Sequence, residues 1–252
     1  MGPMVLDIDV TRDEIHFGAS LTVRFLRSRP AAESRKGDEL AVDTESYPIY
    51  RLDELPCQAP ALSDGVLIPL HPHEVLQISF SGRWWKPNAV IVAVGDHNII
   101  SGKPWDGGLS ADPQNYLVCP EQERLDGLDL RECLDRRALA ADQSCPAETQ
   151  PDGAGWHQRL RLVVYEPRPG LFPDRRRRVP RPEENMRGSS HLDKHRSTLA
   201  GKEPFQIRPD PHGIATWDQD DCRSIDVYII ERAKFEILTG IRPPCISTDH
   251  IR

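Results

Sequence analysis

The sequence lacks the short motifs that identify the commonest enzyme classes. It contains no P-loop, no GxGxxG, no GxSxG and no HExxH pattern. Each of these patterns places backbone or side-chain groups around a phosphate, a dinucleotide, a nucleophilic serine or a zinc ion. Nucleotide-binding, dinucleotide-binding, α/β-hydrolase and zincin functions are therefore not expected.

Positive charge, long apolar runs and an export signal are also lacking. The 252 residues carry a formal net charge of −7, whereas neutralisation of phosphates by Lys and Arg supplies most nucleic-acid affinity. The longest apolar run, 89–95, is far shorter than the roughly 20 residues that a membrane helix needs. The N-terminus has no basic segment followed by an apolar one. We expect a soluble cytoplasmic protein with no membrane span and no nucleic-acid partner.

Closely spaced cysteines are absent, whereas proline is abundant. The six cysteines form no CxxC pair, so in the cytoplasm we expect six reduced thiols. The 23 prolines each remove a backbone donor and disfavour helices and inner strands. Short elements, many turns and long irregular connections are therefore predicted.

Strand patterns outnumber helix patterns along the chain. Apolar residues alternate with polar ones in most candidate strands, and 89–95 is apolar on both faces, as in a central strand. The predicted strands are 21–25, 66–70, 76–80, 89–95, 160–164 and 225–230. Helices are indicated at 130–139 and after the last strand, where Gly240 suits a C-cap. Strands do not alternate regularly with helices, so we expect a β-rich α+β fold with an antiparallel sheet or sandwich-like core.

Two stretches interrupt the strand pattern. Residues 28–46 are polar and charged without a period, and they are predicted to form a loop or a disordered insert. Residues 167–204 are rich in Pro and Arg and are predicted to form a long loop. The length of the chain suits a single domain over 1–252.

The segment HPHE is the sharpest candidate for chemistry. Alternate residues of an extended chain face the same way, so His71 and His73 could bind one zinc or iron ion together with His97. Glu74 or Asp96 could then act as a ligand or a general base, in a metal-dependent hydrolase or oxidoreductase. The competing interpretation is a polar loop at a strand entry, whose imidazoles hydrogen-bond to the backbone.

Trp84 and Trp105 are the candidate ligand-binding aromatics. An exposed indole can stack on a sugar or on a proline-rich peptide, as in a carbohydrate- or peptide-binding module. The alternative is that these rings cover the core. Trp84 and Trp85 would face opposite sides of a strand and could not form one platform.

Four blocks resemble a poorly characterised bacterial family that has no agreed mechanism. They read RWWKPNAVIVAVGDHNIISGKPWD, DPQNYLVCPEQERLDGL, VVYEPRPGLFPDR and PDPHGIATWD. The resemblance implies no catalytic residue. Residues 30–46 and 131–157 depart from the pattern, and the chain stops soon after ILTGIRPP. The resemblance therefore implies a divergent or C-terminally truncated member.

These observations favour a non-catalytic binding or structural-interaction protein. Its expected partner is another protein or a second copy of the chain. The metal-dependent enzyme and the peptide- or carbohydrate-binding module are the alternatives. The enzyme would use the histidine cluster, whereas the binding module would use the exposed tryptophans.

Overall fold

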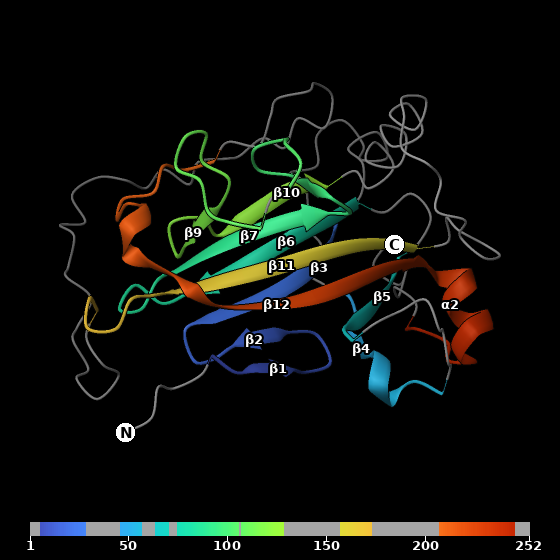
Figure 1. Ribbon diagram of the computed structural model, residues 1–252. Helices are drawn as coiled ribbons and strands as arrows, with labels where there is room; N and C mark the ends of the chain where they lie inside the picture. The colour runs from blue at the N-terminus through green and yellow to red at the C-terminus, as the bar shows by residue number, and fades with distance from the viewer. Residues whose placement is uncertain are drawn as a thin grey trace, which may run out of the picture.

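The computed structural model of the chain contains two β-sheets that pack face to face (Figure 1). It describes residues 6–28, 46–56, 64–70, 75–105, 107–128, 157–172 and 207–244. The first sheet consists, in spatial order, of β1 (Ile8–Val10), β2 (Ile15–Phe17), β3 (Leu21–Ser28), β6 (Val75–Gly82) and β10 (Arg124–Leu128). The predicted β-rich α+β class with a sandwich-like core is confirmed.

The second sheet is mixed and larger. Its spatial order is β4 (Tyr50–Arg51), β5 (Val66–Leu70), β12 (Trp217–Glu231), β11 (His157–Pro167), β7 (Asn88–Val94) and β8 (His97–Asn98). Strand β9 (Leu117–Cys119) also pairs with β7. All of its pairs are antiparallel except β5 with β12, which run parallel.

The main core lies between the two sheets. Each predicted alternation is confirmed, because the apolar sides of 21–25, 76–80 and 160–164 all face this core. Strand β7 is buried along its whole length. Its even-numbered residues from 90 to 94 face the main core, whereas Ala89 and Ile91 pack on the outer side of the sheet. The prediction of a central strand is therefore confirmed.

Two separate clusters cover the outer face of the second sheet. At one end, residues 105–118 and Trp217 pack over β7 and β11. At the other end, α2 (Arg232–Thr239) places Phe235 against β5 and β12, beside β5 in Figure 1. Gly240 adopts a left-handed conformation and its N–H donates to Glu236 O. The predicted C-cap is confirmed, whereas the helix predicted at 130–139 lies outside the described residues.

Strand β12 is longer than its apolar pattern indicates. We predicted a strand over 225–230, but the structure has one from Trp217 to Glu231. Residues 218–221 are polar and include three Asp residues, yet they belong to this strand, which pairs with β11. Backbone pairing, rather than side-chain alternation, sets the length of this element.

The predicted interruptions begin where the strands end. Strand β3 reaches Ser28, and Ser46 forms a bridge with Leu26, so residues 29–45 lie outside the described part. Pro167 ends β11, and 173–204 lie outside it as well. Pro69 lies in β5, which has β12 on one side and the short β4 on the other, and β4 pairs only with Val66 and Leu67. No helix in the described residues is long and apolar enough to cross a membrane.

Candidate functional site

A cleft of about 510 Å³ opens at the edge of the sandwich, between β1 of the first sheet and β5 and β12 of the second. Its lining comprises Ile8, Val10, Arg51, Asp53, Asp64, Gly65, Val66, Ser224, Ile225 and Asp226. The apolar members pack on or belong to the main core and form the floor. Arg51, Asp53 and Asp64 form the rim. This volume lies within the range of about 300–1,000 Å³ typical of ligand sites.

Strand β1 presents an unpaired backbone edge to this cleft. It forms a hairpin with β2, in which Thr11 N–H donates to Glu14 O at 2.9 Å and Gly18 N–H donates to Asp7 O at 2.7 Å. Hydrogen-bonded pairs alternate with non-hydrogen-bonded pairs along an antiparallel ladder. The N–H and C=O groups of Ile8 and Val10 therefore point away from β2, and no described residue bonds to them.

Strand β12 provides a second open edge on the opposite wall. Its pairing with β5 starts at Val227, and Gly65 lies against Asp226 just before it. The residues of β12 before Asp226 have no described strand partner on that side. Gly95 N–H donates to Arg159 O at 2.9 Å, so the backbone groups of Arg159 face β7 and those of Leu160 and Leu162 face β12. Ile225, which lies opposite Leu162, therefore directs its backbone groups to β11, and the N–H and C=O of Ser224 face the open side. Both sheets therefore offer backbone groups at the cleft.

Gly65 allows β5 to approach β12 closely at the cleft. A Cβ atom at this position would lie 2.3 Å from Asp226 O, and its φ is +153°. Both the distance and the backbone conformation exclude other residues without a local shift. Gly65 therefore allows the segment that carries Asp64 to lie directly against β12 at Asp226.

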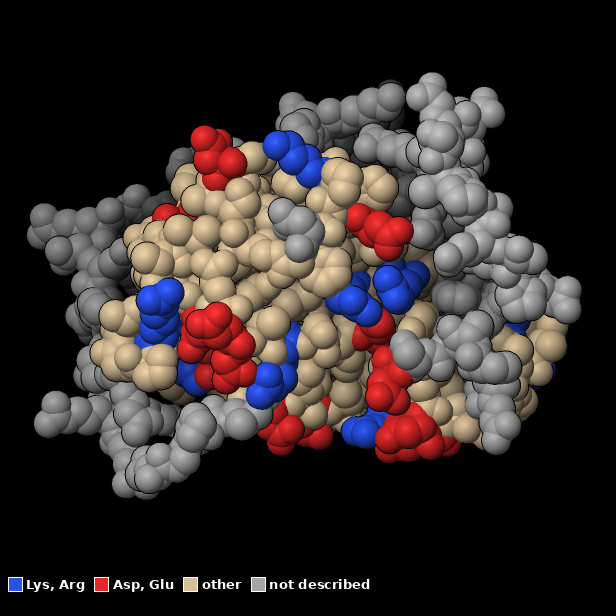
Figure 2. Space-filling model, in the orientation of Figure 1, with Lys and Arg blue, Asp and Glu red and all other residues tan. Residues whose placement is uncertain are grey.

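The rim carries paired charges with an acidic excess. Arg51 donates to Asp53 at 3.1 and 3.0 Å and lies 3.4 Å from Glu54 Oε1. The hydrogen bonds from Arg51 hold the pKa of Asp53 below its ordinary value. Asp64 is exposed at the same rim. Figure 2 shows acidic side chains over β1 and over the region of β4 and η2 (Leu52–Glu54).

Asp226 faces the other side of the sheet and is paired there. Arg161 donates to its two carboxylate oxygens at 2.6 and 2.7 Å. The Arg161 guanidinium also lies 5.5 Å from the centroid of the Trp105 ring. The hydrogen bonds to Asp226 raise the pKa of Arg161. This bidentate pair links β11 to β12 behind the cleft.

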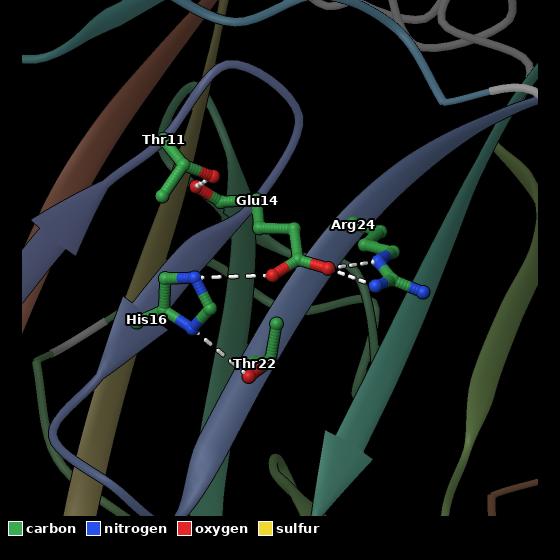
Figure 3. A network of polar contacts seen from close by, with 5 residues as sticks. All are labelled: Thr11, Glu14, His16, Thr22 and Arg24. Carbon is green, nitrogen blue, oxygen red and sulfur yellow. Dashed lines mark hydrogen bonds and ion pairs between the residues drawn. The ribbon is translucent and has the colours of Figure 1, made fainter.

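A polar network on the outer face of the first sheet fixes the β1–β2 hairpin (Figure 3). Glu14 accepts two hydrogen bonds from Arg24 of β3 and lies 3.0 Å from His16 Nε2. The other ring nitrogen of His16 lies 3.1 Å from Thr22 Oγ1. The sequence analysis missed this network. Its signal was the polar side of the alternating segments EIHF and LTVRF.

The order carboxylate, imidazole, hydroxyl in this network matches a hydrolytic triad. A triad also needs a substrate cleft and donors for an oxyanion. Neither Glu14, His16 nor Thr22 lines the cleft, and Arg24 already binds the carboxylate. The contacts therefore support a structural role, the alignment of β1, β2 and β3.

A second network joins two of the blocks singled out in the sequence. Asp210 Oδ2 accepts hydrogen bonds from Tyr116 OH at 2.6 Å and from Trp217 Nε1 at 2.9 Å. Burial raises the pKa of Asp210, but these bonds and those from backbone amides, including His212 N–H, outweigh it, so the pKa is lowered overall. Burial and the bond to Asp210 raise the pKa of Tyr116. The network fastens residues 207–217 to the sandwich.

The predicted metal ligands are not brought together within the described residues. His71 and His73, and Glu74 beside them, lie outside that part of the chain. His97 is exposed on β8. No group of three or more His, Cys, Asp or Glu side chains suited to a metal occurs among the residues that the structure places. The three-histidine site therefore stays a prediction.

The two predicted ligand-binding tryptophans lie in different settings. Trp84 is half-buried in the turn between β6 and β7, so it does not lie on a strand. Trp105 packs against the outer cluster over β7 and β11, with Arg161 over its ring. Neither of them lines the cleft. Binding at Trp84 or Trp105 stays a prediction.

The described cysteines are unpaired thiols. Cys119 is fully buried, and burial raises its pKa, which opposes the thiolate that a nucleophile requires. Its Sγ lies 3.4 Å from Gln122 O. Cys222 is also free and is partly exposed.

Comparison with known proteins adds no relative to this picture. No protein-family model, no curated protein and no solved structure matches the chain. The resemblance of its four blocks to a bacterial family stays a prediction.

Proposed function

We propose that this chain is a non-catalytic binding protein whose ligand site is the cleft between β1, β5 and β12. The observation that carries the proposal is the composition of the cleft, with an apolar floor beneath a charged rim. Burial of apolar ligand surface supplies affinity, whereas a few charged groups at the rim select and orient the ligand. We also propose a cytoplasmic location, with which the unpaired Cys119 and Cys222 agree.

The placement of the perturbed groups supports binding rather than catalysis. A catalytic acid or base faces a cleft with a pKa suited to its task. Tyr116, Cys119 and Asp210 have shifted pKa values, but none of them lines the cleft. At the rim, Asp53 is instead held as a carboxylate by Arg51. The metal-dependent enzyme at His71, His73 and His97 is the competing prediction.

A ligand screen by thermal unfolding tests the proposal. A ligand that binds only the folded state raises the unfolding midpoint. We expect peptides or small molecules from a mixed panel to raise the midpoint of the full-length chain. Val10→Trp places a large ring in the cleft, so it should abolish these shifts. Zinc and iron are included in the panel, with His71→Ala/His73→Ala as the matching variant.

Ile237→Trp is the matched control, because Ile237 is 82% exposed on α2 and does not line the cleft. It should preserve every shift. The proposal is wrong if no compound raises the midpoint, or if Val10→Trp binds each compound as well as the parent chain does. A metal-dependent shift that only the double histidine variant removes would favour the enzyme.

A further inference from the structure

We infer that the cleft binds an extended polypeptide segment as an added strand on β1, with alternate apolar side chains in the cleft and basic side chains beside them. The inference rests on the proposed function and specifies its ligand. Strand addition to a sheet edge uses main-chain hydrogen bonds for affinity and pockets for alternate side chains for specificity.

The backbone of β1 supplies the hydrogen-bonding groups. The N–H and C=O groups of Ile8 and Val10 face outward, while Asp9 pairs with His16 of β2. The outward-facing positions lie two positions apart in the chain, with Asp9 between them, which is the repeat of an extended strand. An incoming segment can therefore bond to both positions without disturbing the hairpin.

The same geometry directs the side chains of the segment. Ile8 and Val10 turn their side chains to the cleft side of the first sheet, where they pack against the core. Residues of an added strand that lie opposite them point the same way. Apolar residues at these alternate positions would contact Ile225 and Val66 on the far wall.

The charge of the rim selects basic residues. Arg51 is the cation of the rim, and its charge is balanced by Asp53 and Glu54. Asp64 lines the cleft. The hydrogen bond to Asp53 raises the pKa of Arg51, and the charge of Asp9 of β1 adds to this rise. The carboxylates outnumber the guanidinium, so Lys or Arg in the segment is favoured and acidic residues are opposed.

Three fluorescent peptides of seven residues test the inference by anisotropy. One alternates Lys and Val, one alternates Glu and Val, and one has the composition of the first with its Val residues together. Only the first can present Val on one face and Lys on the other. We expect the intact chain to bind it at least about tenfold more tightly than either control.

The variant Val10→Pro distinguishes binding by strand addition on β1 from non-specific attraction of a basic peptide to an acidic protein. It removes an outward N–H that β2 does not use, so the fold should persist and affinity for the alternating basic peptide should fall about tenfold or more. If this variant does not fold, hydrogen exchange provides the readout. The amides of Ile8 and Val10 should exchange at least about tenfold more slowly in the peptide-bound parent chain.

The outcomes distinguish the inference from the function. The inference is overturned if the two Lys-containing peptides bind equally well, or if the acidic peptide binds as well as the alternating basic one. Binding that leaves the amides of Ile8 and Val10 unprotected from exchange also overturns it. If no peptide binds while other ligands still depend on Val10, the inference fails and the binding function stands. A parent dimer that Val10→Pro dissociates would show that a second copy occupies the edge, which also overturns the inference.

Discussion

At the scale of single residues, the contacts of a side chain matter more than its chemical type. Gly65 must lack a Cβ because Asp226 O occupies the space. Asp210 is an acidic residue in a polar stretch, yet Tyr116 and Trp217 reach it from other segments and stabilise its charge. Asp210 lies in the block PDPHGIATWD, and the spacing of residues in the sequence does not identify Tyr116 as its partner.

We predict that Gly65→Ala lowers the free energy of unfolding by at least about 2 kcal/mol, because its methyl group overlaps Asp226 O and the residue keeps a strained φ. Chemical denaturation measures the change. Gly108→Ala is the matched control, since a Cβ there meets nothing within 4 Å, and it should alter stability by less than about 0.5 kcal/mol. Equal effects of the two substitutions would contradict the proposed close approach.

The lowered pKa of Asp210 predicts a loss of stability in acid. The stabilisation is complete above the ordinary aspartate pKa of about 4 and is lost as the pH falls through the lower pKa of the folded state. Urea unfolding between pH 7 and 2 should therefore show a steeper acid loss for the parent chain than for Asp210→Asn. Tyr116→Phe should cost about 1–2 kcal/mol at pH 7 and less in acid. Parallel pH profiles for all three proteins would contradict this prediction.

At the scale of elements, the edges of the two sheets create the cleft. Strand β1 ends the first sheet, and β12 extends beyond the start of β5 in the second. The network of Glu14, His16 and Arg24 holds the β1–β2 hairpin against β3. The open backbone groups of β1 therefore belong to a fixed element rather than to an irregular loop.

Two proline substitutions in β1 should differ in their effect on stability. Val10→Pro removes an N–H that faces the open edge and should cost about 1 kcal/mol or less. Asp9→Pro removes an N–H that pairs with His16 and should cost about 3 kcal/mol. Denaturation of both variants measures the difference. A larger loss for Val10→Pro would show that the pairing pattern of β1 is reversed.

At the scale of the whole molecule, one core joins the two sheets. Residues of β3 and β6 pack directly against residues of β7, β11 and β12. Two smaller clusters cover the outer face of the second sheet and depend on it for their support. We therefore predict that the described residues unfold as one cooperative unit, and one domain over 1–252 stays a prediction.

Unfolding of the full chain should occur in one transition. The chain has five tryptophans, of which Trp105 and Trp217 pack in the outer cluster, so tryptophan fluorescence includes a signal from that region, whereas far-UV circular dichroism reports on both sheets. The two signals should share one midpoint in urea, as in a two-state transition. Val92→Ala, at a central position of the main core, should lower both midpoints equally. Separate midpoints would show that the sheets unfold independently.

The strand-rich class and most of the core follow from local sequence patterns. Alternation in 21–25, 76–80 and 160–164 and the apolar run at 89–95 are local signals, because a strand repeats every two residues. The cap at Gly240 is also a local signal, because a glycine directly after a helix can adopt the left-handed conformation that ends it. These features follow from neighbouring residues, so they could be predicted without knowledge of the fold.

The position of the candidate site depends on how distant segments pack together. The cleft is lined by four segments, from β1, the β4–η2 region, the start of β5 and the middle of β12, and its shape depends on which strands end where. No local spacing encodes an unpaired strand edge or the approach of Gly65 to Asp226. Histidines and tryptophans are the conspicuous candidates in the sequence. The cleft, by contrast, is built from ordinary Ile, Val, Asp and Arg residues that become significant only through packing.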